Sequence, residues 1–93
     1  MKKSITIIGR RWFQKSCGNT YHTVKVYVNN ELLEESEKTY GYGDQYKQTG
    51  YEILLKHNVF SKFKTQWDIE NYMRDNRKSF LISHSDVSRE KDL

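Results

Sequence analysis

The chain has no proline, one cysteine and no long apolar run. Cys17 alone cannot form an internal disulfide, and the lack of a CxxC pair or a tight histidine cluster argues against a zinc site. The apolar run at residues 5–8 is too short for a signal peptide, and no segment approaches the roughly 20 apolar residues of a membrane span. We therefore expect a cytoplasmic protein that holds no metal and no cofactor.

The length of 93 residues predicts a single domain over residues 1–93 with a small core. Only 35% of the residues are hydrophobic, but 14% are aromatic, which indicates an ordered chain that packs a few large rings. Every charged residue at positions 1–30 is basic, whereas positions 31–37 hold four glutamates and no base. The net charge of +4 is therefore concentrated near the N-terminus.

Residue alternation predicts a β-hairpin. Residues 4–15 and 20–28 are rich in Ile, Val, Thr and aromatic residues, and a Ser-Cys-Gly-Asn break separates them. In the second run Val24, Val26 and Val28 share one side, so we expect all three to be buried.

A third strand is expected over about residues 31–40, after a two-residue turn at Asn29 and Asn30. The charged side chains of this strand are typical of a strand at the edge of a sheet. A fourth strand is predicted at residues 79–83. A charged C-terminal tail is predicted at about residues 88–93.

Two helices lie between these strands. Asp44 is expected to cap a helix over residues 44–57, with Gly50 at a close approach to the sheet. A capping-box variant at residues 65–68 predicts a short helix that buries Ile69, Tyr72 and Met73. The order βββααβ predicts an α+β fold, with a three- to four-stranded, mainly antiparallel sheet and helices on one face.

The hairpin register raises a question about charge. A loop at residues 16–19 would pair Lys15 with Thr20, and Arg10 would then face Lys25 on the side away from the helices. Two like charges directly opposite each other are unfavourable in a sheet. Either a β-bulge at Gly9 changes the register, or an anion relieves the repulsion.

Basic and aromatic residues are interleaved along this hairpin. Cations hold phosphates and aromatic rings stack on bases, so the combination is typical of a nucleic-acid or nucleotide site. No recognised motif accompanies it, and a solvated strand face is the alternative interpretation. The candidate ligand-binding residues are Arg10, Arg11, Trp12, Lys15, Tyr21, Lys25 and Tyr27.

Other candidate sites are weaker. Tyr40 and Tyr42 are candidates to line a pocket before the first helix, although their GYGD sequence matches no phosphate-binding loop. His84 and Asp86 share one side of a strand around Ser85, but no nucleophile-elbow motif is present. We therefore predict no catalytic residues and a protein that is not an enzyme.

Three segments carry a resemblance to known proteins. The runs GRRWF at 9–13, GNTYH at 18–22 and YGYGD at 40–44 are similar to a group of short, mostly uncharacterised proteins encoded by bacteriophages and prophages. The resemblance covers about residues 5–55 and carries no named activity. It implies a phage setting in a bacterial host, where small proteins of this size commonly inhibit or divert host systems.

The sequence therefore predicts a small phage-type binding protein that uses a basic-aromatic sheet face to bind nucleic acid or a nucleotide. The alternative is a protein–protein inhibitor of a host defence or nuclease factor, and a small enzyme is less well supported. Because Ile8, Trp12 and Tyr27 would share the open face with the cations, we also expect at least a dimer.

Overall fold

The computed structural model describes residues 4–60 and 62–93. Within these residues the chain forms five strands and two α-helices, with two short turns of 3-10 helix near the C-terminus. In chain order the elements are β1 (Ile5–Gln14), β2 (Asn19–Val28), β3 (Glu31–Glu35), β4 (Thr39–Tyr40), α1 (Gln45–Lys56), α2 (Gln66–Asp75), η1 (Arg77–Ser79), β5 (Phe80–Val87) and η2 (Glu90–Asp92).

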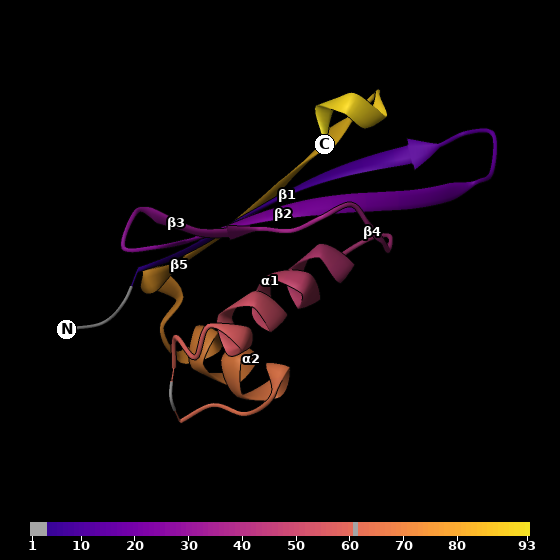
Figure 1. Cartoon of the computed structure of the whole chain (residues 1–93). Helices are drawn as coiled ribbons and strands as arrows, with labels where there is room; N and C mark the ends of the chain where they lie inside the picture. The colour runs from indigo at the N-terminus through magenta and orange to yellow at the C-terminus, as the bar shows by residue number, and fades with distance from the viewer. Residues whose placement is uncertain (1–3, 61) are drawn as a thin grey trace.

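The strands form one mixed sheet in the order β3-β2-β1-β5, and the short β4 also pairs with β2. Only β5 is parallel to its neighbour β1, because the two helices carry the chain back to the end of the sheet where β1 begins. Both helices lie on one side of the sheet and η2 lies on the other (Figure 1). The predicted α+β fold is confirmed. We call the side under the helices the helix face and the other side the open face.

The predicted third strand is divided in two. The Val24 amide donates to the Ser36 hydroxyl at 2.8 Å, and the Ser36 amide donates to the Val24 carbonyl at 2.7 Å. The Ser36 side chain thus replaces a regular ladder partner, and pairing resumes only at β4. This interruption is why the sheet has five strands rather than three or four.

The hairpin loop lies one residue earlier than predicted. The amides of Cys17 and Gly18 both donate to the Gln14 carbonyl, and Gly18 has a φ of +70°. Gln14 therefore pairs with Asn19, and Arg10 faces Thr23. The prediction that Arg10 lies directly opposite Lys25 is wrong, because glycine takes the left-handed conformation that closes the loop.

The β-bulge considered at Gly9 is also wrong, because the register between β1 and β2 is continuous. Gly9 instead allows α1 to approach β1 closely. A Cβ atom at this position would lie 2.5 Å from Cδ2 of Tyr46, the first inward ring of α1. The predicted approach of Gly50 is confirmed, since a Cβ there would lie 2.9 Å from Cγ2 of Ile7. These two glycines set how closely α1 packs on β1.

The core lies between α1 and the helix face of β1 and β2. Val24 and Val26 are buried as predicted, but Val28 is only half-buried because it ends β2 beside the Asn29–Asn30 turn. On α2 only Ile69 is fully buried, and Tyr72 and Met73 lie at the edge of the core. The buried apolar side chains are Ile5, Ile7, Val24, Val26, Tyr46, Tyr51, Ile53, Leu54 and Ile69.

The helix starts differ in how they are capped. The predicted capping box is confirmed, since the Asp68 amide donates to the Thr65 hydroxyl and the Asp68 carboxylate accepts from the Thr65 amide. Asp44 occupies the N-cap position of α1, but its side chain makes no capping hydrogen bond. The side chain of Gln45 instead accepts from the Tyr42 amide at 3.1 Å. Neither described α-helix is long and apolar enough to cross a membrane.

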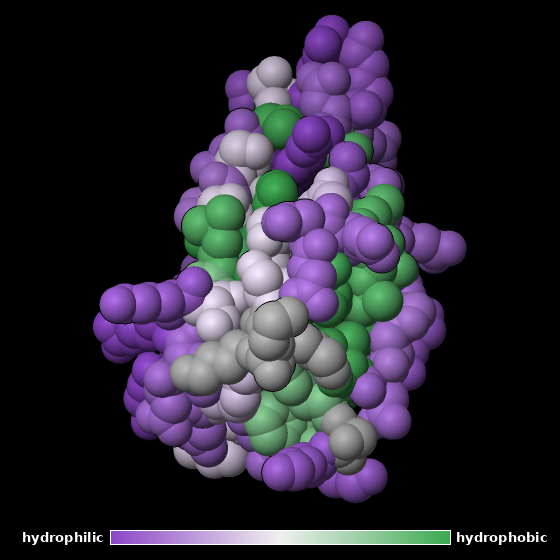
Figure 2. All heavy atoms as spheres, turned by 90° about the vertical axis from the view of Figure 1, so that its left-hand side faces the viewer, coloured by the Kyte–Doolittle hydropathy of each residue, from purple (hydrophilic) through white to green (hydrophobic). Residues whose placement is uncertain are grey.

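The C-terminal part of the chain consists of β5 and η2. β5 continues to Val87, beyond the predicted residues 79–83, and η2 then turns over the open face (Figure 1). Apolar surface at the end of the molecule where β1 begins is divided into separate patches among hydrophilic side chains (Figure 2). Leu32 and Leu81, which are 54% and 61% exposed, are among the large apolar side chains at the surface.

Gly9→Ala should destabilise the protein by about 1–3 kcal/mol, because the added methyl group overlaps the ring of Tyr46. A urea titration that follows tryptophan fluorescence measures this directly. Gly50→Ala is the matched control. Its methyl group would lie 2.9 Å from Cγ2 of the buried Ile7, but the gain in helix propensity of about 1 kcal/mol offsets part of this contact, so the loss should be smaller than in Gly9→Ala. Equal losses in both variants would contradict this account of Gly9.

Candidate functional site

Strand alternation divides the predicted ligand-binding residues between the two faces. Arg11 pairs with the buried His22 and lies on the helix face, so it is not part of an open-face site. Lys15 lies exposed in the hairpin loop. The open face brings together Arg10, Trp12, Tyr21, Lys25 and Tyr27.

Three aromatic rings form a row across β1, β2 and β4. Trp12 and Tyr21 are stacked, with ring centroids 5.9 Å apart, and Tyr21 meets Tyr40 edge-on at 5.8 Å. Tyr40 is 61% exposed, so the end of the row is open. We call Trp12, Tyr21 and Tyr40 the aromatic row. The aromatic row therefore presents the surfaces of three neighbouring rings on the open face.

Cations lie next to this row. Arg10 and Lys25 are diagonal neighbours on the open face, a relation that places Cβ atoms about 7–8 Å apart. Their repulsion is therefore weaker than direct opposition would give, and Glu35 beside Lys25 lowers it further. The Nζ atom of Lys38 lies 5.1 Å from the centroid of Tyr21, a cation–π arrangement.

The C-terminal turn already places oxygen atoms on two of these cations. Arg10 donates to the main-chain carbonyl of Asp92 at 3.3 Å. Lys38 forms an ion pair with the Glu90 carboxylate. A cavity of about 110 Å³ lies beside this turn, lined in part by Arg10, Lys25 and Leu93. The open face thus has cations that donate hydrogen bonds to oxygen atoms.

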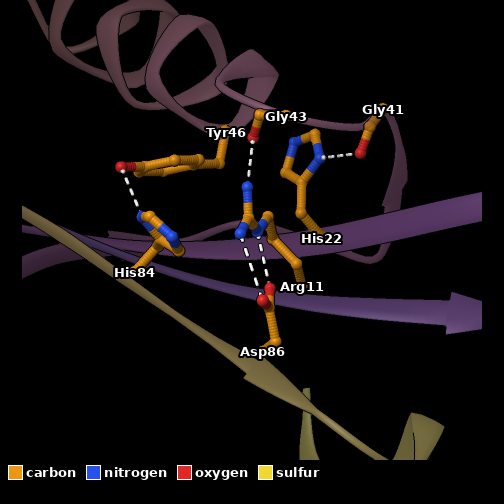
Figure 3. Close-up of polar contacts among 7 residues, drawn as sticks. All are labelled: Arg11, His22, Gly41, Gly43, Tyr46, His84 and Asp86. Carbon is orange, nitrogen blue, oxygen red and sulfur yellow. Dashed lines mark hydrogen bonds and ion pairs between the residues drawn. The ribbon is translucent and has the colours of Figure 1, made fainter.

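Arg11 forms hydrogen bonds with neighbouring elements on the helix face (Figure 3). Its guanidinium donates to both carboxylate oxygens of Asp86, at 2.7 and 3.2 Å, and to the Gly43 carbonyl at 3.0 Å. The hydrogen bonds between Arg11 and Asp86 raise the pKa of Arg11 above its ordinary value and lower the pKa of Asp86 below its own. Arg11 therefore joins β1 to β5 and to the loop before α1.

The histidines make similar cross-links (Figure 3). The His22 ring lies 3.2 Å from the Gly41 carbonyl and 2.7 Å from the Thr49 hydroxyl, so both ring nitrogens have partners. His84 Nδ1 lies 3.2 Å from the Tyr46 hydroxyl. Ser85 lies on the opposite face from His84, so this serine and histidine do not form a Ser-His-Asp arrangement.

Tyr42 and Cys17 lie apart from these groups. Tyr42 is 66% exposed on its loop, whereas Tyr40 belongs to the aromatic row. Cys17 is exposed in the hairpin loop. Across residues 4–60 and 62–93, no group of three His, Cys, Asp or Glu side chains is arranged to hold a metal ion.

Comparisons of the chain with protein-family models, curated proteins and solved structures found no match. The resemblance to phage proteins therefore stays a prediction.

Sequence reasoning missed Lys38 and the C-terminal turn as parts of the open face. Alternation in Lys38-Thr-Tyr40 was a usable signal, because residues two apart on a strand lie on the same side. The position of η2 had no comparable signal, since a contact between Arg10 and Asp92 spans almost the whole chain.

Asp86→Asn should make the protein less sensitive to acid. Because the folded state lowers the pKa of Asp86, its stabilisation is complete above the unfolded pKa of about 3.9 and is lost as the pH falls through the lower folded value. The Asp86 side chain is 71% exposed, so the effect should be about 0.2–1 kcal/mol.

Free energies of unfolding at neutral pH and below pH 3 test this prediction. The difference between the two conditions should shrink in Asp86→Asn and stay unchanged in Asp75→Asn, an exposed carboxylate without an ion pair in the described part of the chain. The same acid response in both variants would show that the Arg11–Asp86 ion pair does not contribute to the acid sensitivity of the protein.

Proposed function

We propose that this chain is a non-enzymatic binding protein that holds single-stranded nucleic acid or a nucleotide on its open face. The observation that supports the proposal best is the aromatic row beside Arg10, Lys25 and Lys38 on one surface. Stacking of a base on an aromatic ring contributes about 1–3 kcal/mol and tolerates any base. Cations within reach of the rings would hold the connecting phosphates.

The contacts of η2 support the same chemistry. Arg10 and Lys38 are each engaged by an oxygen atom of η2, as they would be by phosphate oxygens. Arg11 takes no part, because Asp86 and Gly43 use its donors on the other face. The proposed site is therefore smaller than the seven residues predicted from the sequence.

Fluorescence anisotropy with a labelled oligothymidylate tests the site. Binding should weaken steeply between about 50 and 200 mM salt. Trp12→Ala should lose roughly 1–3 kcal/mol of binding free energy, since it removes one stacking surface. Lys25→Glu should weaken binding and reduce its salt dependence, because it removes one of the three cations beside the rings, while Lys78→Glu, an equal charge change on η1 away from the open face, should leave both unchanged.

Two further measurements separate the alternatives. Thermal stabilisation by a mononucleotide, without binding of the oligothymidylate, would identify a nucleotide site rather than a strand site. If neither ligand binds, or if Lys25→Glu and Lys78→Glu behave alike, the open face is an ordinary solvated surface. The protein–protein inhibitor would then be the better proposal.

Glu90→Gln should strengthen binding of the oligothymidylate. The change removes the carboxylate that competes for Lys38, and because this ion pair is solvent-exposed the effect should be small. The expected gain in affinity is therefore roughly two- to fivefold. Glu52→Gln on α1 is the control and should change nothing. Weaker binding in Glu90→Gln would mean that η2 forms part of the site rather than competing with it.

A further inference from the structure

A groove of about 590 Å³ lies on the helix side of the molecule, apart from the open face. Residues from α1, α2, η1 and the first half of β5 line it. Tyr51, Met73, Phe80 and Ile82 supply apolar surface, and the Tyr51 hydroxyl lies 3.7 Å from the Met73 sulfur. Burial raises the pKa of Tyr51 to about 12, so the side chain of Tyr51 stays neutral in the groove.

The rim of the groove carries positive charge. Arg74 and Arg77 both line it, and within residues 4–60 and 62–93 neither forms an ion pair. Lys47 is already near the Asp44 carboxylate, at 3.7 Å. Glu70 is the acid that remains on the rim. The groove therefore combines four apolar or aromatic side chains with a polar lining, in which two guanidinium groups are available to an acidic ligand.

β5 is an edge strand beside this groove. It ends the order β3-β2-β1-β5, so in the described part of the chain its outer edge pairs with no strand. It pairs with β1 over all eight residues without a bulge, and it has neither proline nor lysine. Edge strands usually carry such features, because unpaired N–H and C=O groups accept another strand, and β5 has only the charged Asp86 in its second half, away from the groove.

The edge and the groove together identify one kind of occupant. A strand added to β5 would place alternate side chains on the helix side, where β5 itself presents Phe80 and Ile82. The groove provides apolar surface for those side chains, and Arg74 and Arg77 provide partners for carboxylates. A small molecule would use the groove but would leave the strand edge unpaired.

A second copy of the chain fits less well. The helix-facing residues that its β5 would bring are Phe80, Ile82, His84 and Asp86. The acid in this set, Asp86, is already held by two hydrogen bonds from Arg11. Self-pairing would therefore supply no free carboxylate to Arg74 and Arg77.

We propose that β5 binds an extended segment of another protein by strand addition, with apolar and acidic side chains of that segment in the groove. This site is separate from the open face and does not depend on nucleic-acid binding. The full chain would then join a protein partner on the helix side while the open face stays accessible.

Random peptides displayed on phage and selected against the immobilised full chain would supply the probe. The most enriched peptide, synthesised with a fluorescein label, should contain alternating apolar residues and at least one acid. Arg74→Glu and Arg77→Glu should each weaken its binding by about tenfold. Lys78→Glu is the matched control, since Lys78 follows Arg77 in η1 but does not line the groove.

N-methylated versions of this peptide test strand addition itself. Successive residues of an added strand point their N–H groups alternately toward and away from β5. Methylation at one set of alternate positions should therefore abolish binding, whereas methylation at the other set should not. Unlabelled oligothymidylate should not displace the peptide.

Four outcomes would overturn the proposal. They are the failure of any peptide to enrich, equal tolerance of both methylated sets, equal affinities in Arg74→Glu and Lys78→Glu, and displacement by oligothymidylate. Light scattering that shows a dimer disrupted by Arg74→Glu would instead assign the edge to a second copy of the chain. Failure of nucleic-acid binding on the open face would leave all of these measurements unaffected.

Discussion

The close packing of α1 against β1 is the constraint on which the rest of this structure depends. Tyr46 occupies the space where a side chain at residue 9 would lie, and Ile7 does the same at residue 50. Because backbone and ring come so close, the helix face of β1 and β2 is covered from Ile5 to Gly9 and from His22 to Val26, and it holds most of the core. Alternation then sends the intervening polar and aromatic side chains to the open face.

Arg11 is the exception to this division, since it is a charged residue on the covered side. Its five donors need acceptors there, and Asp86 and Gly43 provide them from β5 and from the loop before α1. The same contacts hold the second half of β5 beside β1. A residue that the sequence pattern assigns to ligand binding therefore connects three elements of the fold.

The molecule consequently has two surfaces of different chemistry. The open face combines rings with cations, and η2 already engages two of those cations. The groove beside β5 combines apolar surface with guanidinium groups and an unpaired strand edge. The first suits phosphates and bases, whereas the second suits an extended polypeptide. Both surfaces present basic side chains.

Local pattern in the sequence determined much of this protein. The alternation of Val24 and Val26, the Asn29–Asn30 turn and the Thr65–Asp68 capping box each depend on neighbouring residues, and all three are present in the structure. The side of the sheet that each hairpin residue occupies was also predictable, because a shift of one residue in both strands preserves it.

The tertiary structure decided what depends on residues far apart in the chain. The partner of Arg11 lies 75 positions away, and the η2 residue that meets Arg10 lies 82 positions away. The length and direction of β5 follow from its pairing with β1 rather than from its own propensity. Trp67, whose sequence context suits either core or surface, is 64% exposed because Ile69 takes the buried position on α2. Such contacts form by packing between elements, which no local pattern encodes.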